Sequence, residues 1–443
     1  MAKKQKSYRP KPRKPRGFRD RSGAELLAEQ AMLARITQVY ASYGFLPLET
    51  PAFEYTEALG KFLPDVDRPN QGVFSLQDDD EQWMSLRYDL TAPLARHVAE
   101  HYDSLPKPFR RYQVGTVWRN EKPGPGRFRE FTQCDADSVG AAAPFADAEA
   151  IMMLTDAVIA AGVEKKDFAV RISSRKIMSG LLSSIGLDTE DGGQSGTVLR
   201  AMDKYDRLGA EGVRYLLGEG RKDESGDYTE GAKLSPGQAD QVLAFMQAKG
   251  AGNAATLGAM GALIGDSEIG RAGIDELLRI SETLEDMGYA EQAKIDPSVV
   301  RGLDYYTGPV FEAELTFAVT NEKGQEVQFG SIGSGGRYDD LVKRFKGVEV
   351  PAVGCSIGVS RLLSALEAKG QDTKGQQKLI VVATPDRDRI EDFFQIAARL
   401  RGNLKEHNVA VDIAFGAANL GKQLKYADNR GAAAVLENPR KAV

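Results

Sequence analysis

The chain of 443 residues is too long for one ordinary hydrophobic core, so we expect several domains. Its 42% hydrophobic and 27% charged residues are typical of globular proteins, and no apolar run approaches the roughly 20 residues that span a bilayer, which excludes an integral membrane protein. The net charge of −5 argues against wholesale nonspecific binding of nucleic acid.

Few residues are suited to thiol or metal chemistry. Cys134 and Cys355 cannot form a disulfide framework, and the sequence does not open with the apolar segment of a secretory signal, so we expect a protein of the reducing cytoplasm. Three histidines without a CxxC or HExxH motif leave little material for catalytic zinc or a histidine triad. We therefore expect arginines, carboxylates and backbone groups to carry the chemistry.

The first segment, residues 1–15, mixes basic side chains with prolines that prevent packing. This composition predicts a disordered basic tail. Such a tail either is simply solvated or contacts a phosphate backbone.

The elements that follow predict a mixed fold. A helix is expected over residues 24–43, where apolar side chains recur near helical spacing, and it ends at Gly44. A strand interrupted by Pro51 comes next, then strand-like runs separated by turn residues, and a second helix at 145–161. This order is typical of an α+β fold with hairpins rather than of repeated βαβ units.

The middle of the chain reads as an insertion into that fold. Residues 171–270 carry weak, glycine-rich signals and are predicted to be mostly helical. A strongly helical pattern at 268–287 follows, and strand-like sequence resumes after residue 299. We expect these later strands to complete the first sheet, so that one domain comprises residues 16–170 and 271–367.

A polar linker at residues 368–377 leads into a small α/β domain at 378–443. A buried-type strand near 379–383 is followed by helix, strand and helix, the last near 420–429. A strand-like run at 432–436 lies close to the end of the sequence, so we expect a sheet of few strands.

The most informative segment is a predicted hairpin at residues 117–140, VWRNEKPGPGRFREFTQCDADSVG. Strand side chains alternate between two faces. One face therefore gathers Arg129, Phe131, Gln133, Asp135 and Asp137 on the returning strand, with Arg119 and Glu121 on the entering strand. Arginine forks neutralise phosphates, a phenyl ring stacks on a base and a carboxylate holds a cation, which suits a nucleotide beside an amino acid. The alternative is a solvated amphipathic strand.

Two further segments pair residues in the same way. Asp89 and Thr91 are two apart, hence on one face of an expected strand, just before a helix that Pro93 could open. In VRGLDYYTGPVFE, Arg301, Leu303 and Tyr305 are expected on one strand face, where a cation, an apolar wall and a phenol could meet a small ligand. Taken alone, either segment could also be an ordinary strand.

Taken together, these segments resemble the histidyl-tRNA synthetase family over residues 15–430. GFLPLETPAFE, with Pro51, is similar to class II motif 1; FRRYQVGTVWRNEKPGPGRFREFTQCDAD is similar to motif 2; and VGCSIGVSRLLSAL, with Arg361, is similar to motif 3. RGLDYYTG and SGGRYDDLV are similar to the two signatures specific to the histidine enzyme. The resemblance implies an α+β catalytic domain built on an antiparallel sheet, a helical insertion and a C-terminal α/β anticodon-binding domain.

The resemblance also implies a role for each matching residue. The catalytic residues would be Arg119, Arg301 and Gln133. Histidine would be bound by Asp89, Thr91, Arg119, Gln133, Asp137, Arg301, Leu303, Tyr305, Tyr306 and Tyr338. ATP would be bound by Arg119, Glu121, Arg127, Arg129, Phe131 and Arg361.

Within these sets the resemblance implies finer roles. The α-amino group of histidine would contact Asp89 and Thr91, and the imidazole would contact Asp137 and Tyr306. Adenine would lie between Phe131 and Arg361. L-histidine, ATP with Mg²⁺ on its pyrophosphate, and tRNA(His) are the implied partners, and the metal ligands stay unassigned. Motif 1 builds a subunit interface in this class, so a cytoplasmic homodimer is expected.

Two features depart from the common pattern. Gly124 and Pro125 stand where many bacterial relatives carry a polar pair that helps to recognise the extra 5′ guanosine of histidine tRNA. We therefore expect this chain to rely more on other acceptor or anticodon contacts. The C-terminal domain is also shorter than is usual in the family.

Two noncatalytic readings share the expected fold. One is the paralogue that binds histidine and partners a phosphoribosyltransferase, and the other is a synthetase-like RNA-binding or signalling module. The arginines required for catalysis, Arg119, Arg127, Arg301 and Arg361, are all present, which argues against both readings.

Overall fold

The computed structural model describes residues 10–59, 72–123, 128–187, 193–222, 226–302, 306–320, 326–370, 378–415 and 419–437. The turn of the predicted hairpin, with Gly124, Pro125 and Arg127, lies outside these residues, as do Leu303 and Tyr305. The chain divides into two compact units: the smaller holds Ser22–Ala28 and the chain from Lys374, and the larger holds the rest.

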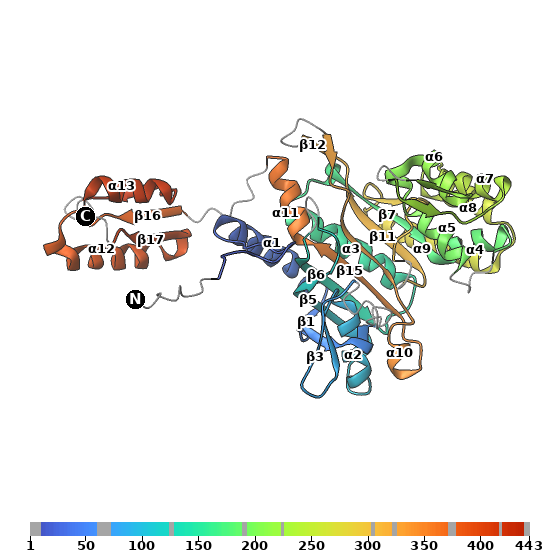
Figure 1. Ribbon diagram of the computed structural model, residues 1–443, viewed down its shortest axis with the longest axis horizontal. Coiled ribbons are helices and arrows are strands. Elements are labelled where there is room, and N and C mark those ends of the chain that lie inside the picture. The colour runs from blue at the N-terminus through green and yellow to red at the C-terminus, as the bar shows by residue number, and fades with distance from the viewer. Residues whose placement is uncertain are drawn as a thin grey trace, which may run out of the picture. The chain divides into compact units, whose positions relative to one another are not determined.

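An eight-stranded sheet forms the centre of the larger unit (Figure 1). In the order in which they pair, its strands are β1 (Leu46–Pro47), β5 (Phe109–Trp118), β6 (Glu130–Val139), β15 (Ala352–Gly358), β14 (Ser331–Arg337), β11 (Pro309–Leu315), β7 (Phe168–Ser174) and β10 (Ala293–Ile295). The six inner strands pair antiparallel, and each edge strand pairs parallel with its neighbour. The expected α+β fold is therefore confirmed, and the strands after the insertion do complete the first sheet.

Helices cover this sheet because their apolar faces need a partner. Helix α3 (Phe145–Ala161) packs on β11, β14 and β15, and α11 (Val359–Ala368) packs on β6, β14 and β15. Helix α1 (Ala24–Ser42) buries Met32, Ile36 and Tyr40, and the Tyr40 hydroxyl donates to the carbonyl of Cys134 on β6. The helices expected at 24–43 and 145–161 are thus confirmed.

Between β7 and β10 the chain is mostly helical, as the sequence predicts. Its elements are α4 (Arg175–Ser184), α5 (Gln194–Met202), α6 (Tyr205–Leu217), β8 (Gly220–Lys222), β9 (Tyr228–Glu230), α7 (Pro236–Met246), α8 (Asn253–Ile264) and α9 (Glu268–Asp286). Figure 1 shows these helices gathered beside the sheet, in green and yellow. Helix α7 begins at a capping box in which Ser235 and Gln238 satisfy each other's backbone N–H groups.

Smaller elements complete the larger unit. They are the three-stranded sheet of β2 (Phe53–Tyr55), β4 (Trp83–Leu86) and β3 (Ser75–Gln77), the hairpin of β12 (Ala318–Thr320) and β13 (Glu326–Gln328), the helices α2 (Thr91–His101) and α10 (Lys343–Lys346), and the 3₁₀ turns η1 (Thr56–Leu59) and η2 (Lys165–Asp167). Helix α2 follows β4 directly and buries Leu94, Ala95 and Val98 against Tyr338 and Val350.

The smaller unit carries a parallel sheet in the order β17 (Val409–Ile413), β16 (Lys378–Val382) and β18 (Ala434–Leu436). Its helices are α12 (Ile390–Asn403) and α13 (Leu420–Asn429), with 3₁₀ turns η3 (Arg387–Arg389) and η4 (Lys405–His407). The strand–helix order predicted from the sequence is confirmed. No helix within the described ranges is both long and apolar enough to cross a membrane.

Candidate active site

A cavity lies against β6, β15 and β14 and draws residues from distant parts of the sequence. It is lined by Asp89, Thr91, Arg119, Gln133, Asp135, Asp137, Tyr306, Ser334, Tyr338, Gly354, Cys355 and Ser356. Most of the residues proposed for histidine from the sequence therefore border one space. Acidic side chains dominate the charged part of the lining, and Arg119 is its cation.

Asp137, a buried carboxylate of the lining, is held by two buried side chains. The Arg111 guanidinium lies 2.9 Å from Asp137 Oδ2 and also donates to the Leu90 carbonyl at 2.9 Å. The Tyr338 hydroxyl donates to Asp137 Oδ1. Burial raises the pKa of Asp137, and Arg111 opposes that rise. A buried carboxylate with fixed partners suits recognition of a ring N–H.

Gly354 gives Asp137 the space for this position. The two residues are directly opposite on β15 and β6, and a Cβ at 354 would lie 2.0 Å from the Asp137 carboxylate. Because that distance is far inside van der Waals contact, any other residue at 354 would displace the carboxylate. Motif 3 therefore contributes a glycine to the cavity as well as its arginine.

Asp89 and Thr91 lie at the start of a helix, so their expected placement on a strand was wrong. Thr91 is the first residue of α2, and Asp89 Oδ1 accepts a hydrogen bond from the Ala92 N–H at 3.1 Å. Pro93 is the third residue of the helix, where the missing N–H costs no hydrogen bond. Both side chains still border the cavity, because the helix begins there.

Of the residues expected at ATP, Arg119 and Glu121 follow β5, Arg129 precedes β6 and Phe131 lies on β6. Arg119 follows the last residue of β5, donates from Nε to the Tyr88 carbonyl at 3.1 Å, and lies 5.1 Å from the ring centroid of Phe131. Arg129 Nε donates to the Glu121 carbonyl at 2.8 Å. Of the ATP residues with described positions, only Arg119 lines the cavity; Phe131 and Arg361, expected at adenine, do not.

Arg301 lies outside the described strands, so its expected place on a strand was wrong, while Leu303 and Tyr305, expected on the same face, lie outside the described residues. Its Nε and Nη2 lie 3.1 and 3.0 Å from the two Glu312 oxygens, and Asp203 lies 3.9 Å away. Glu312 on β11 is directly opposite Ser334, which lines the cavity. Arg301 is therefore held next to the cavity by an ion pair rather than by strand alternation. Arg361 is the third residue of α11 and is exposed.

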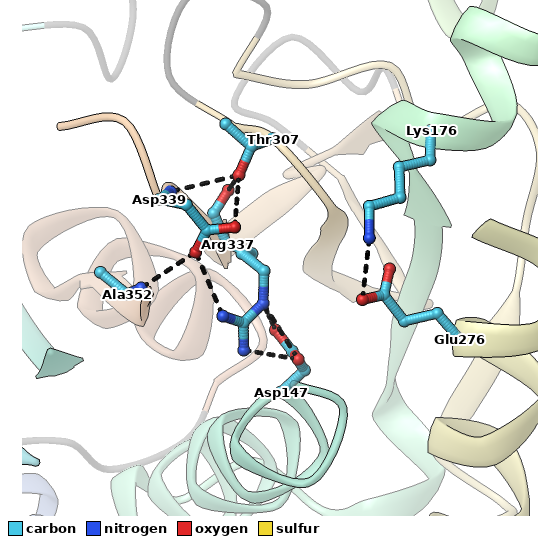
Figure 2. A network of polar contacts seen from close by, with 7 residues as sticks. All are labelled: Asp147, Lys176, Glu276, Thr307, Arg337, Asp339 and Ala352. Carbon is cyan, nitrogen blue, oxygen red and sulfur yellow. Dashed lines mark hydrogen bonds and ion pairs between the residues drawn. The ribbon is translucent and has the colours of Figure 1, made fainter. Parts of the chain in front are cut away.

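A buried ion-pair network fixes the two histidine signatures to each other (Figure 2). Arg337 donates from Nε and Nη2 to Asp147 at 2.9 and 2.8 Å, and from Nη1 to Asp339 at 3.2 Å. Asp339 in turn accepts from the Thr307 hydroxyl at 3.2 Å and from the Ala352 N–H at 3.1 Å. Thr307 and Arg337 are neighbours of Tyr306 and Tyr338, so the network sets the positions of both phenols.

Sequence reasoning missed the structural cations Arg111 and Arg337. On β5, Arg111 occupies a buried position of the alternating pattern, which was the available signal. No local pattern indicates its partner, because Asp137 lies on the next strand. Asp135 was placed on the correct face from the sequence but was given no role.

Comparisons with known proteins point in one direction. A family profile described as histidyl-tRNA synthetase matches residues 17–362. Proteins described as histidine–tRNA ligases from Jannaschia sp. and Caulobacter vibrioides are each 54% identical to the chain; each alignment covers 97% of the chain, with 87% and 86% of the respective relative.

Two solved structures are similar over most of the chain. The histidyl-tRNA synthetase from Nostoc sp. has a TM-score of 0.73 at 29% identity, covering 96% of this chain and 90% of that one. A Bacillus halodurans protein described as an ATP phosphoribosyltransferase regulatory subunit/histidyl-tRNA synthetase also has a TM-score of 0.73, covering 97% of this chain and 99% of that one. Its identity is 24%, so it supports the fold alone.

Proposed function

The chain belongs to the histidyl-tRNA synthetase family and has histidine–tRNA ligase activity, and we propose here how its cavity carries out that reaction. The supporting observation is a cavity that is lined both by buried carboxylates and by Arg119. Histidine is a cation at its α-amino group, an anion at its carboxylate and a hydrogen-bond donor at its ring. The lining offers a partner for each group.

In the proposed complex the imidazole N–H donates to Asp137, beside Tyr306 and Tyr338. The α-ammonium group binds between Asp89 and Thr91 at the start of α2. The carboxylate then points to Arg119. This orientation brings the reacting oxygen toward Arg119, which lies 5.1 Å from the ring centroid of Phe131.

Activation joins two anions, because the histidine carboxylate attacks the α-phosphate of ATP. A carboxyl oxygen forms a bond to phosphorus while the bond to the bridging oxygen of pyrophosphate breaks. Positioning and charge neutralisation lower the barrier of such a step more than acid–base catalysis does. Arg119 and Arg301 supply the positive charge, and the adenylate is then attacked by the terminal ribose of tRNA(His).

Magnesium enters this proposal with the substrate. Among the residues with described positions, no group of three or more His, Cys, Asp or Glu side chains is placed to hold a metal ion. Mg²⁺ commonly binds through substrate phosphates with few protein ligands. We therefore place it on the pyrophosphate of ATP and assign it no cage of side chains.

Histidine-dependent exchange of pyrophosphate into ATP, followed by charging of tRNA(His), tests the proposal. Exchange that requires histidine is the expected result. Exchange without charging would fit a protein that activates histidine but no longer transfers it to tRNA. Absence of exchange would contradict the proposed site. The noncatalytic regulatory reading shares the fold, but relatives at 54% identity are described as ligases.

The small C-terminal unit is proposed to bind the anticodon region in the cytoplasm. Lys422 and Lys425 on α13 are exposed and suited to phosphate contacts. Removing residues 374–443 is expected to lower tRNA charging by at least about 10-fold, the scale of losing one or two charged contacts, while histidine-dependent exchange changes little. A parallel loss of both activities would contradict this division of labour.

A homodimer is proposed from an apolar surface in the motif 1 region. On the sheet of β2, β4 and β3, one face carries Phe53, Tyr55 and Leu76, with exposed fractions of 41%, 54% and 43%. The opposite face buries Glu54, which pairs with Arg96 at 2.8 Å. This inverted pattern, apolar outside and charged inside, is typical of a surface that a second copy covers.

Replacing Tyr55 by arginine is expected to shift the protein from dimer to monomer. The Tyr55 side chain is exposed in a single copy of the chain, so an arginine there stays solvated in the monomer. In the dimer the same arginine would be a buried, unpaired charge at the interface. Light scattering after size exclusion gives the mass of the species. Replacement of exposed Tyr228, on β9, by arginine is the matched control. Unchanged mass of the Tyr55 variant, or a monomeric wild type, would contradict the proposed interface.

A further inference from the structure

Three polar residues of the cavity lining, Asp135, Ser356 and Gln133, are neighbours in space, and we call them the relay. Gln133 and Asp135 are two apart on β6 and therefore share its cavity face. Ser356 on β15 is directly opposite Asp135. Gln133 Nε2 donates to Ser356 Oγ at 2.7 Å, and the Ser356 hydroxyl, facing Asp135 across the strand pair, lowers the pKa of that carboxyl. None of the proposed steps above uses Asp135 or Ser356.

The chemistry of these three groups fixes the direction of the relay. When Asp135 is ionised it only accepts hydrogen bonds, and the single hydroxyl proton of Ser356 then points to Asp135. The Ser356 oxygen then has only lone pairs to offer, and Gln133 must turn its NH₂ group toward it. The amide carbonyl oxygen is consequently left for another donor.

The burial of these groups makes an unused acceptor costly, so a donor from within the cavity is needed. Gln133 and Asp135 are 8% and 2% exposed. Within the described part of the chain, Gln133 Oε1 and Asp135 Oδ1 are buried and have no hydrogen-bond partner. Buried acceptors without a donor are rare, because each costs the desolvation of a polar group. Both belong to residues that line the cavity, so a ligand N–H can satisfy them.

We propose that Asp135 and Ser356 are positioning residues that orient the Gln133 amide, so that its carbonyl oxygen accepts a hydrogen bond from the α-ammonium group of histidine. This inference rests on the proposed function and adds a specificity determinant to it. A flipped amide would present its NH₂ group to a cation and would repel it. The relay therefore favours amino acids over ring analogues that lack the amino group.

Charge in the cavity agrees with this assignment. Two buried carboxylates, Asp135 and Asp137, face one buried cation, Arg111, with Asp89 also on the lining. Burial and Asp137 raise the pKa of Asp135, whereas Arg111 and Ser356 lower it. A bound ammonium group compensates the excess negative charge, and it also keeps Asp135 in the acceptor-only form that the relay requires.

The first test removes the hydroxyl. In Ser356→Ala the KM for histidine in pyrophosphate exchange is expected to rise about 10-fold or more, the scale of one charge-assisted hydrogen bond, while the KM for ATP stays within about twofold. The inhibition constant of 3-(imidazol-4-yl)propionate, which lacks the amino group, is expected to stay unchanged. Ser356→Thr keeps the hydroxyl and should restore the KM for histidine. Ser364→Ala, a serine of α11 whose hydroxyl bonds the Ser360 carbonyl, is the matched control.

The second test reverses the polarity of the relay. Asparagine at 135 has the shape of aspartate but can donate to the Ser356 oxygen, which frees the hydroxyl proton for the Gln133 carbonyl. Asp135→Asn is therefore expected to raise the KM for histidine as Ser356→Ala does, again without weakening the deamino analogue.

Either of two results would overturn the relay. One is an equal loss of affinity for histidine and for the deamino analogue, which indicates a general change in the cavity. The other is an unchanged KM for histidine in both variants. Loss of exchange in the wild-type protein would instead contradict the proposed function, so the two failures are distinguishable.

Discussion

Arg301→Lys is expected to lower histidine-dependent pyrophosphate exchange by at least about 100-fold, the scale observed when one preorganised donor is removed from a transition state. The guanidinium uses Nε and Nη2 to hold Glu312, which leaves its remaining nitrogen for the α-phosphate. Lysine keeps the charge but has a single nitrogen, so it cannot hold Glu312 through a fork and contact the phosphate in a fixed geometry.

The loss is expected in kcat, because the contact that is removed is made in the transition state. Steady-state exchange at saturating histidine and ATP measures this kcat. Arg279→Lys, on the exposed side of α9, is the matched control for the substitution itself. Exchange by Arg301→Lys within threefold of the wild type would remove Arg301 from the proposed mechanism. A rise in KM alone would give it a binding role only.

Arg111→Met is expected to destabilise the larger unit by about 3–5 kcal/mol, the cost of leaving a buried charge without its partner. The arginine is completely buried and lies 2.9 Å from Asp137. Methionine fills similar space but cannot neutralise Asp137 or Asp135. Both tryptophans of the chain, Trp83 and Trp118, lie in this unit, so their fluorescence during urea unfolding reports its stability.

A double variant separates stability from recognition. Adding Asp137→Asn to Arg111→Met removes the unpaired charge, so most of the lost stability should return. Histidine activation should stay low, because the carboxylate that receives the imidazole N–H is gone. A loss of stability below about 1 kcal/mol for Arg111→Met would be no larger than that of many surface substitutions. It would show that the Arg111–Asp137 ion pair is not the structural centre of the cavity.

The extent to which the site could be predicted differs from residue to residue. Alternation along β6 correctly grouped Gln133, Asp135 and Asp137, because a strand's faces are fixed by its own backbone. The same reasoning failed for Asp89 and Arg301, since it assumed strands where the chain forms a helix start and an irregular segment. Elements that are not regular carry no periodicity from which a side chain's direction can be read.

The sequence by itself determined the order of helices and strands, the polar face of the motif 2 strand and the resemblance to a family. These depend on local spacing and on motif residues, which are properties of short segments. The tertiary structure alone decided that β15 lies beside β6, placing Gly354 and Ser356 opposite Asp137 and Asp135. It also decided that Arg301 is held by Glu312 and that Arg111 neutralises Asp137. Pairing between strands more than 200 residues apart depends on how the whole core packs, and no local pattern records it.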